Sequence, residues 1–256
     1  MKKIAIITGA SSGIGKEFAL TVNKNFNVDE LWVIARNEGK LNELREDISL
    51  PIKILAMDLS KENSIDLLKN ALEEERPLVK ILINCSGFGK FNATEKYPLS
   101  ENMNMVDLNC KGVMGTCLTC LPFMENCSKI INIASVAAFQ PIPYINVYAA
   151  TKAFVLYFSR ALNSEVKSRG ITVTAVCPFW TKTAFFDRAV ATEEPVVKKY
   201  IAMYDPKDIV KRAYRDAKKG KDVSKYGFKA RAQAMLVKIL PHSLVMKIWK
   251  SQQKLK

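Results

Sequence analysis

Short runs of β-branched and aliphatic residues recur along the chain, with amphipathic segments between them. The runs lie at residues 4–7, 31–35, 52–57, 79–83, 130–134 and 171–176. They are short and rich in Ile and Val, as strands of a sheet covered on both faces are, and helical spacing returns between them. This alternation predicts an α/β fold built on a doubly wound parallel sheet. Because no internal repeat or linker divides the chain, we expect a single domain over residues 1–256.

Two segments near the C-terminus depart from this alternation. Residues 179–205 show no clear period and lie between prolines, which predicts a loop with short helices, interpreted functionally as a substrate lid. Helical spacing returns at Asp208, residues 220–227 can add a last short strand, and residues 228–256 form a basic helical C-terminal extension. Pro241 divides the apolar stripe of that extension at residues 235–240 from a second apolar group at 244–249.

A glycine-rich stretch, Thr-Gly-Ala-Ser-Ser-Gly-Ile-Gly at residues 8–15, joins the first apolar run to a helical segment at residues 16–25. Gly9, Gly13 and Gly15 lack a Cβ, so the backbone can turn tightly and approach a ligand. Free N–H groups at the start of a helix attract negative charge. The stretch therefore suits a dinucleotide pyrophosphate, although its spacing differs from the commonest fingerprint and a purely structural turn is the alternative.

Composition narrows the class of protein. With 256 residues and 48% hydrophobic content, the chain can bury a substantial core. No apolar run reaches the length of a membrane span, and we expect a cytoplasmic protein. The six cysteines follow no disulfide framework. Cys117 and Cys120 have redox or zinc spacing, but His242 is the only histidine, so we expect both thiols to pack in the core and no metal site.

The net charge of +14 is concentrated near the C-terminus. Residues 204–256 hold 15 Lys and Arg against 4 Asp. Three explanations stay open: a solvated helical face, peripheral contact with an anionic membrane aided by Leu244 and Trp249, or attraction of an acyl carrier protein or coenzyme A thioester. Nucleic-acid binding is not expected, because no recognisable module is present.

Three residues suggest acid–base chemistry. Tyr148 and Lys152 lie four apart in a helical segment at residues 145–167, so both project from one face. A neighbouring ammonium favours the phenolate, and we expect Lys152 to lower the pKa of Tyr148 and allow proton exchange with a substrate oxygen. A half-buried tyrosine beside an exposed lysine is the structural alternative. Ser135 follows the run at residues 130–134 and can donate a hydrogen bond to a carbonyl oxygen at the ligand-binding end of a strand.

The stretches Thr8-Gly9-x-x-x-Gly13-x-Gly15, Asn84-Cys85-Ser86-Gly87, Asn109, Ser135 and Tyr148-x-x-x-Lys152, in this order and spacing, resemble the short-chain dehydrogenase/reductase family. The resemblance covers about residues 3 to 185 and is strongest to NADP-preferring hydroxysteroid dehydrogenases and 3-oxoacyl reductases. It implies a Rossmann-type fold, a nicotinamide dinucleotide as hydride carrier and a role in lipid metabolism. It also implies a homo-oligomer, a dimer or tetramer formed through the helices that contain Asn109 and Tyr148, although the long C-terminal helices could obstruct it.

The resemblance also assigns roles by position. Tyr148 is the general acid/base, Ser135 orients the substrate oxygen, and Lys152 lowers the tyrosine pKa and binds ribose hydroxyls. Asn109, in a helical segment that we expect at residues 99–124, holds a water in the proton relay or makes a local hydrogen bond within its helix. Asn84 bonds to a neighbouring strand, Gly87 lines the adenosine side, and Asp58 contacts adenine or caps the next helix. The residues expected to contact the dinucleotide are Gly9, Ser11, Ser12, Gly13, Ile14, Gly15, Arg36, Asn37, Asp58, Asn84, Gly87, Tyr148, Lys152, Pro178 and Thr183.

The sequence departs from the family pattern at two places. Cys85 and Ser86 stand inside the family's Asn-Asn-Ala-Gly, whose outer residues are kept. Phe179 follows Pro178 where the family has glycine, which changes one wall of the nicotinamide pocket, while Thr183 keeps the position of the threonine that binds the carboxamide.

The charge at the end of the second predicted strand indicates which nicotinamide cofactor binds. An NAD site places Asp or Glu at the end of the second strand, whereas here that strand ends in Arg36 and Asn37. Arg36 is a partner for a 2′-phosphate, with Ser11 or Asn37 adding a hydrogen bond, so we expect NADP(H).

The substrate follows from the residues around the reacting centre. Since cells keep NADP largely reduced, we expect an enzyme that reduces a ketone to a secondary alcohol. The substrate would lie between residues 144–147 and 179–191, where Phe179, Trp180, Phe185 and Phe186 favour an apolar, steroid-like or acyl ketone. Core packing of these aromatics is the alternative for the residues, and a 3-oxoacyl thioester reductase or a non-enzymatic NADP sensor is the alternative for the function.

Overall fold

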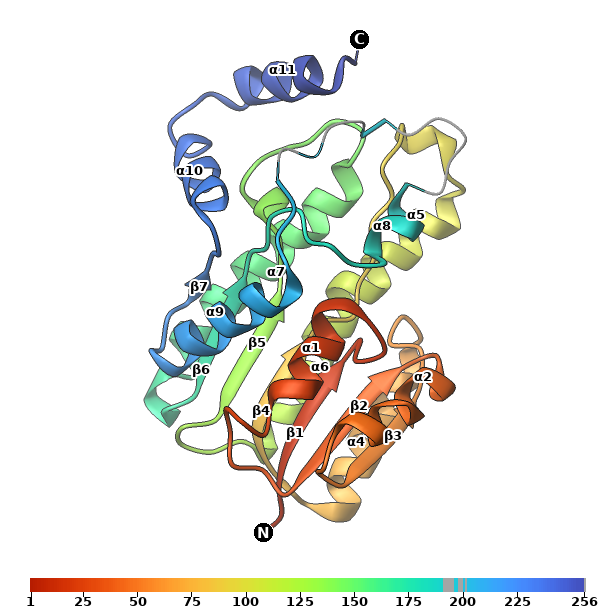
Figure 1. The fold of residues 1–256 in the computed structure, drawn as a ribbon, viewed down its shortest axis with the longest axis vertical. Coiled ribbons are helices and arrows are strands. Elements are labelled where there is room, and N and C mark those ends of the chain that lie inside the picture. Colours follow the sequence, from red (N-terminus) through yellow and green to blue (C-terminus); the bar gives the residue numbers. More distant parts are fainter. Residues whose placement is uncertain (191–195, 198–199, 201, 256) are drawn as a thin grey trace.

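The computed structural model describes residues 1–190, 196–197, 200 and 202–255. Its centre is a seven-stranded, all-parallel sheet in the order β3-β2-β1-β4-β5-β6-β7 (Figure 1). The strands are β1 (Lys3–Thr8), β2 (Glu30–Ala35), β3 (Ile52–Ala56), β4 (Leu78–Asn84), β5 (Lys129–Ile133), β6 (Thr172–Val176) and β7 (Val223–Ser224). Each agrees closely with an apolar run or predicted strand in the sequence. The predicted doubly wound parallel sheet in a single domain of Rossmann type is confirmed.

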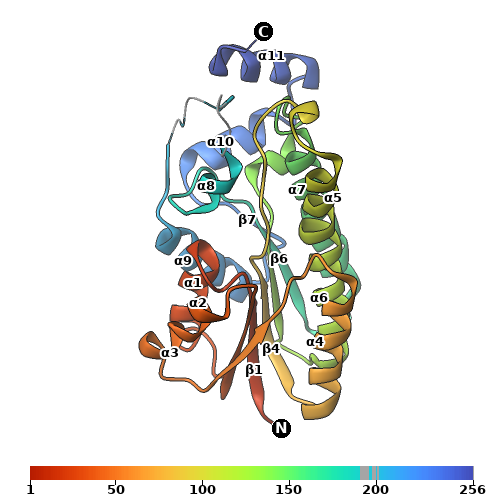
Figure 2. The same ribbon diagram turned by 90° about the vertical axis from the view of Figure 1, so that its right-hand side faces the viewer.

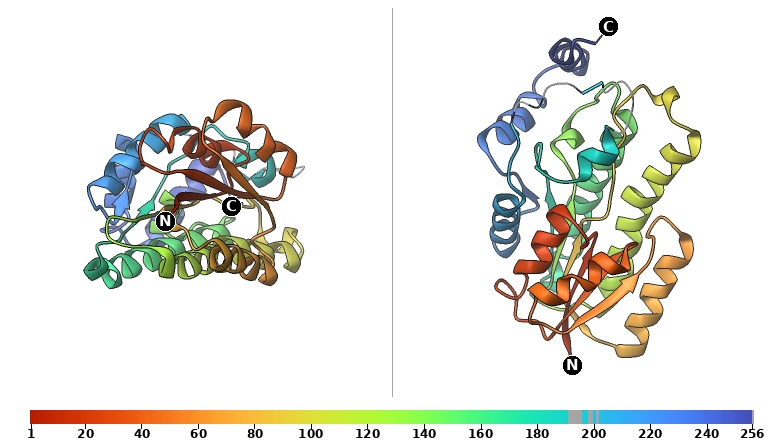
Figure 3. Two further views of the ribbon diagram at one scale, coloured as in Figure 1. Left: turned by 90° about the horizontal axis from the view of Figure 1, so that it is seen from below. Right: turned by 45° about the vertical axis from the view of Figure 1, so that its right-hand side comes forward.

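Helices cover both faces of the sheet, as Figure 2 and the view from below in Figure 3 show. One layer contains α1 (Gly13–Thr21), α2 (Glu38–Asn42), α3 (Leu44–Asp47) and α9 (Pro206–Lys218). The other contains α4 (Glu62–Glu75), α5 (Leu99–Val106), α6 (Val113–Cys120) and α7 (Asn146–Glu165). A short helix, α8 (Phe185–Ala189), lies in the segment expected to form a lid, but residues 191–195, 198–199 and 201 of that segment lie outside the described residues.

The alternation of side chains along β1 and β2 divides the core between the two faces. Ile4, Ile6, Trp32 and Ile34 pack with α4, α6 and α7, whereas Ala5, Ile7, Leu31 and Val33 pack with α1 and α9. All eight side chains are buried, so both faces of these strands are apolar, as a sheet covered on both sides requires. On the second face, the Tyr214 hydroxyl donates to the Phe18 carbonyl oxygen at 3.0 Å and joins α9 to α1.

The helical segment expected from residue 99 to 124 is not a single α-helix. Between α5 and α6 lies η2 (Asp107–Gly112), one turn of π-helix, and a 3₁₀ turn, η3 (Leu121–Phe123), follows α6. A π turn inserts one extra residue per turn and is common at functional sites. The apolar spacing of the segment does not reveal this insertion, because a single π turn shifts the helical face by only a fraction of a turn.

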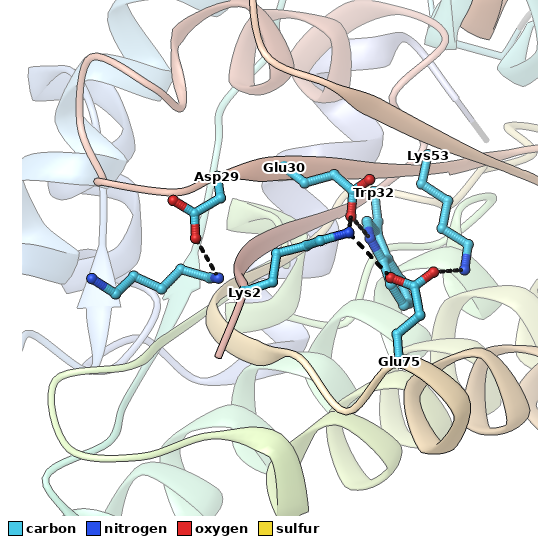
Figure 4. A network of polar contacts seen from close by, with 7 residues as sticks. Lys2, Asp29, Glu30, Trp32, Lys53 and Glu75 are labelled. Atoms are coloured by element: carbon cyan, nitrogen blue, oxygen red, sulfur yellow. Dashed lines mark hydrogen bonds and ion pairs between the residues drawn. The ribbon is translucent and has the colours of Figure 1, made fainter.

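A network of charges joins the amino-terminal ends of β1, β2 and β3 to α4 (Figure 4). The Lys2 ammonium donates to Glu30 at 3.1 Å and to Glu75 at 3.5 Å, and Lys53 also donates to Glu75. Glu30 accepts from the Trp32 indole N–H at 2.9 Å as well. The network lies by the N-terminus, at the end of the sheet opposite the strand ends where ligands bind.

The chain ends in two helices beyond the opposite, carboxyl end of the sheet. After β7 come α10 (Phe228–Leu236) and α11 (His242–Gln253). Helix α11 begins directly after Pro241, as the sequence predicts, but α10 ends at Leu236, before the end of the apolar stripe at residues 235–240. Both lie at the end of the molecule remote from the N-terminus (Figures 1 and 2). Among the residues that the structure describes, no helix is long and apolar enough to cross a membrane.

Candidate active site

The strand order reverses between β1 and β4, and a large cavity opens at the carboxyl ends of these strands. Its volume is about 810 Å³. Ligands of doubly wound sheets bind at this switch point. All of the residues predicted to act or bind there line the cavity except Asn84 and Asn109, which are buried behind its wall.

The glycine loop after β1 requires glycine at three of its positions. Gly9 and Gly13 have φ values of +66° and +53°, in the region that other residues rarely adopt. A Cβ on Gly15 would overlap the carbonyl oxygen of Gly9. Ser12 precedes α1 without capping any backbone N–H, and the first turn of that helix holds no acidic residue. The loop therefore presents free donors and the positive end of a helix, which fits a pyrophosphate group.

The loop after β4 is held against β1 by side-chain hydrogen bonds. The Thr8 hydroxyl accepts from the backbone N–H groups of Cys85 and Ser86, each at 3.1 Å. Asn84 donates to Asn132 of β5 at 2.9 Å, so it does bond to a neighbouring strand.

Gly87 lies in the same loop, where space is short. A Cβ on this residue would lie 2.9 Å from Asn109 Oδ1 and 3.4 Å from Lys152 Nζ. A larger residue would therefore displace the Asn109 side chain, which makes glycine the residue that fits. The expected contact of Gly87 with the adenosine side stays a prediction.

Ser135, Tyr148 and Lys152 meet at one wall of the cavity. Ser135 follows β5 directly, and Tyr148 and Lys152 lie one turn apart on α7. The Ser135 hydroxyl accepts from the Ala137 N–H at 3.1 Å and forms a hydrogen bond with Tyr148. Lys152 donates to the Ile133 carbonyl oxygen at 2.8 Å, with its ammonium 5.7 Å from the centre of the Tyr148 ring. The end of β5 and the helix α7 thus hold Ser135, Tyr148 and Lys152 close to one another.

Burial dominates the acid–base properties of this group. It raises the pKa of Tyr148 to about 12, and the hydrogen bond with Ser135 opposes this only in part. It lowers the pKa of Lys152 to about 8, against the influence of Cys110, Cys85 and Cys177. The pKa of Tyr148 in the protein alone is therefore raised, and the lowering effect expected of Lys152 stays a prediction. Withdrawal from water disfavours the charged form of both groups, and this outweighs their attraction.

Asn109 lies inside the π turn η2 and is completely buried. Its amide nitrogen donates to the Phe88 carbonyl oxygen at 2.9 Å and to the Thr151 hydroxyl at 3.0 Å, and its oxygen accepts from the Phe88 N–H at 3.1 Å. The side chain thus ties η2 to the loop after β4 and to α7, next to Lys152. Its role in a water relay stays a prediction.

The far end of the cavity carries opposite charges. The Arg36 guanidinium, 62% exposed, lies 4.0 Å from the Asp58 carboxylate. Burial alone would raise the pKa of Asp58, but hydrogen bonds from Ser60 and the nearby Arg36 lower it. Asn37 accepts from the Lys40 N–H at 2.9 Å and caps α2, so its carbonyl oxygen is already engaged. An exposed guanidinium thus stands at the end of β2, where an acid would exclude a 2′-phosphate.

Two residues of the cavity wall were not expected from the sequence. Phe91 is buried, with its ring centre 5.8 Å from that of Tyr148, and Arg188 of α8 lies over the Phe88 ring at 3.4 Å and pairs with Glu101 at 3.5 Å. Neither belongs to a motif, since the loop after β4 and the segment after β6 have no period. One sequence feature close to Phe91 is a second glycine in the loop after β4, Gly89. A Cβ on Gly89 would lie 2.9 Å from the Tyr148 ring, so this glycine indicates that the loop passes close to the site.

The wall beside Tyr148 is aromatic, as expected for residues 179–191. Phe185 lies 5.5 Å from Tyr148 between ring centres, and Phe179 and Trp180 pack edge to face at 6.1 Å. These aromatics line the cavity and also pack against one another. Lining of the cavity and core packing, which the sequence offers as alternatives, therefore both occur. Phe179, which stands in place of glycine, forms part of the wall, and Thr183 lies against Gly13.

The paired thiols in α6 belong to the core. Cys117 and Cys120 are fully buried, and burial raises the pKa of Cys117 to about 12, which keeps it an unreactive thiol. All six cysteines are free. In the part of the chain that the structure describes, no cluster of three or more His, Cys, Asp or Glu could hold a metal ion.

The sequence pattern of the short chain dehydrogenases matches residues 3–194, three quarters of the chain. The chain belongs to the short-chain dehydrogenase family. An uncharacterized oxidoreductase of Staphylococcus aureus (strain MRSA252) is 30% identical to this dehydrogenase over 213 residues, which is 81% of this chain and 87% of that protein. A very-long-chain 3-oxoacyl-CoA reductase of Neurospora crassa is 34% identical over 193 residues, 70% of this chain and 56% of the reductase.

Solved structures of the family extend the similarity to the whole fold. A short-chain dehydrogenase from Sphingobium yanoikuyae in complex with NADPH has a TM-score of 0.76 at 25% identity, covering 94% of this chain and 97% of that one. The bulky-bulky ketone specific alcohol dehydrogenase from Comamonas testosteroni has a TM-score of 0.72 at 25% identity, with 95% and 96% covered. The present dehydrogenase is thus an oxidoreductase of this family, whose members bind a nicotinamide cofactor.

Proposed function

We propose that this dehydrogenase is an NADP(H)-dependent reductase that converts a largely apolar ketone into a secondary alcohol. The observation that carries the proposal is the position of Ser135, Tyr148 and Lys152, which line the cavity together with aromatic and aliphatic side chains. The glycine loop fits the cofactor's pyrophosphate, and the cavity has room for a dinucleotide and a substrate together.

The residues of the site match the needs of carbonyl reduction. A reduced nicotinamide bound here supplies the hydride that forms the new C–H bond. With a pKa of about 12, Tyr148 is fully protonated at neutral pH and holds the proton that the developing alkoxide must accept. Ser135 is placed to orient the carbonyl oxygen beside that proton. Lys152, largely charged below its pKa of about 8, stabilises the phenolate left behind.

NADP(H) is favoured over NAD(H) by charge at the end of β2. The Arg36 guanidinium is exposed at the cavity and can form charge-assisted hydrogen bonds with a 2′-phosphate. The counter-ion Asp58 lies 4.0 Å away, a distance too long for a strong hydrogen bond, so Arg36 is free to turn to a ligand. The Sphingobium structure, which contains NADPH, agrees with this choice.

The apolar wall supports a bulky ketone without acidic or basic groups near its carbonyl. The specificity for bulky-bulky ketones named for the Comamonas enzyme agrees with this substrate class. A 3-oxoacyl thioester is the second candidate, favoured by the 34% identity to the Neurospora reductase and by the basic C-terminal helices, which could attract a coenzyme A moiety. The third alternative, a non-enzymatic NADP sensor, leaves the complete set of Ser135, Tyr148 and Lys152 unexplained.

Assembly and location are further parts of the proposal. Large apolar side chains are exposed on the helices expected to form an oligomer: Leu99, Met103, Met114, Leu118, Phe154 and Tyr157. The C-terminal helices lie beyond the end of the sheet and leave the outer face of α6 and α7 uncovered, so they do not obstruct a homo-oligomer there (Figure 2). We also propose a cytoplasmic location, with which six free cysteines agree, and peripheral membrane contact through α10 and α11.

The proposal predicts NADPH oxidation in the presence of bulky ketones or 3-oxoacyl-CoA thioesters, with a preference over NADH. Substitution Tyr148→Phe removes the proton donor and should lower kcat by about 10²-fold or more while the affinity for NADPH, measured by fluorescence, stays within about twofold. Tyr157→Phe, on the exposed face of the same helix, is the matched control and should leave both unchanged. An unchanged rate for Tyr148→Phe, or no turnover across the panel, would overturn the proposal.

A further inference from the structure

The helices α10 and α11 and the turn between them present a concentration of exposed apolar side chains. We call this set the C-terminal apolar surface; it consists of Phe228, Met235, Leu236, Ile239, Leu244 and Ile248. Phe228 is 79%, Ile239 73% and Met235 67% exposed. Single exposed hydrophobic residues need no explanation, but a group of them on two neighbouring helices marks an interaction site.

The same two helices form a wall of the cavity. Val245 and Trp249 of α11 are buried, and the Trp249 indole donates to the Pro143 carbonyl oxygen at 3.0 Å, in the loop that leads to Tyr148. Three members of the C-terminal apolar surface, Phe228, Leu236 and Ile248, line the cavity and are exposed as well. They therefore form its rim, where the inner apolar wall continues into the outer surface.

The positive charge around the C-terminal apolar surface favours an anionic partner. From Lys225 to Lys256 the chain has eight Lys and Arg residues and no Asp or Glu. Arg231, Lys238 and Lys247 are exposed between the apolar side chains. A second copy of the chain would bring like charges together, whereas an anionic lipid surface takes up apolar side chains and attracts the cations around them.

We propose that the C-terminal apolar surface docks on an anionic membrane, and that apolar substrate passes between the lipid and the cavity through the rim of Phe228, Leu236 and Ile248. This inference rests on the proposed ketone reductase. A substrate that dissolves in the bilayer then reaches Tyr148 without crossing water, and an exposed apolar rim is needed for that transfer. The end of the molecule remote from the N-terminus faces the lipid (Figures 1 and 3).

Co-sedimentation with vesicles tests the docking. Wild type should bind vesicles of phosphatidylcholine with about one third phosphatidylserine at least tenfold more tightly than phosphatidylcholine alone. Met235→Gln with Ile239→Gln changes two exposed residues that do not line the cavity, and should weaken binding about tenfold or more. Leu67→Gln on α4, also exposed, is the matched control and should bind as wild type does. Equal binding by the double variant, or none by wild type, would overturn the assignment.

Kinetics with two ketones test the route of the substrate. The double variant should reduce a long-chain ketone held in vesicles about tenfold more slowly than wild type does, and a water-soluble ketone at the wild-type rate. Equal losses on both ketones would overturn transfer through the rim. If wild type reduces neither ketone, the proposed function fails, whereas vesicle binding still decides the docking. If wild type is a dimer that the double variant dissolves, and binds no vesicles, the surface pairs two copies and the inference is wrong.

Discussion

Lys152 is buried, and no carboxylate lies within ion-pair distance of it in the described part of the chain. Its ammonium can therefore be paired only by a negative charge that arises nearby. The ammonium lies 2.8 Å from a single carbonyl oxygen, that of Ile133, and 5.7 Å from the Tyr148 ring centre. Burial favours the neutral form of both Lys152 and Tyr148. In the proposed reduction, Tyr148 gives its proton to the substrate, and the new phenolate is the negative charge that Lys152 lacks.

This coupling predicts the pH dependence of ketone reduction. Tyr148, with a pKa of about 12, stays protonated up to high pH, whereas Lys152 loses its charge as the pH rises through about 8. The value of kcat/KM should therefore be level at about pH 6 to 7.5 and fall above about pH 8, by up to about tenfold per pH unit. Lys152→Arg, whose guanidinium stays charged, should lose activity overall but also lose this fall. A fall that persists in Lys152→Arg would belong to another group.

At the scale of elements, the unit of β1, glycine loop and α1 is held by contacts between backbone atoms. A Cβ on Gly15 would overlap the Gly9 carbonyl oxygen, so strand and helix cannot keep their approach with any larger residue. Gly39 in α2 is the opposite case, because a Cβ there would meet only the Asn37 side-chain oxygen at 3.4 Å.

These two glycines predict opposite changes in stability. Gly15→Ala should lower the free energy of unfolding by about 2 kcal/mol or more, since the displaced atoms are backbone. Gly39→Ala should raise it by about 0.5 to 1 kcal/mol, because alanine is the better helix former and has room. Urea denaturation followed by circular dichroism measures both values. Similar values for the two variants would contradict the packing described for the glycine loop.

The elements also show how far sequence reasoning reaches. The six longer strands were predicted because their runs are short and rich in Ile and Val, and Ser135 could be placed because it directly follows one of them. The π turn at Asn109 was not predicted, because one inserted residue leaves the apolar spacing of residues 99–124 nearly intact. The raised pKa of Tyr148 in the protein alone was not predicted, because spacing shows the neighbour Lys152 but not the depth of burial.

At the scale of the whole molecule, the outer face of α5, α6 and α7 bears on assembly. Leu118 and Tyr157 are exposed by 51% and 66% on that face, away from the cavity. If the proposed homo-oligomer forms there, Leu118→Lys with Tyr157→Lys should reduce the mass measured by light scattering to that of a monomer, because buried like charges repel. Leu67→Lys on α4 should leave the mass unchanged. A wild-type protein that is monomeric at all concentrations would contradict the proposal.

The cavity is lined both by residues that belong to sequence motifs and by residues that no motif contains. The wall with Ser135, Tyr148 and Lys152 belongs to motifs, and the family pattern covers it within residues 3–194. The wall with Phe91 and Arg188 lies in segments without period, where only the fold brings the residues together. The C-terminal helices show an amphipathic pattern in the sequence, but nothing in that pattern places Trp249 against Pro143, a contact between residues 106 positions apart.

Helix α11 contributes to a part of the cavity that the family pattern does not cover. Ser135, Tyr148, Lys152 and the glycine loop lie in the part of the chain that the family shares, while the rim of the cavity lies beyond it, after residue 227. On the proposed function, a change in the last two helices would alter the rim that the ketone crosses and leave Ser135, Tyr148 and Lys152 in place. Membership of the family is thus carried by residues 3–194, whereas the proposed entrance for the substrate is carried by the last two helices.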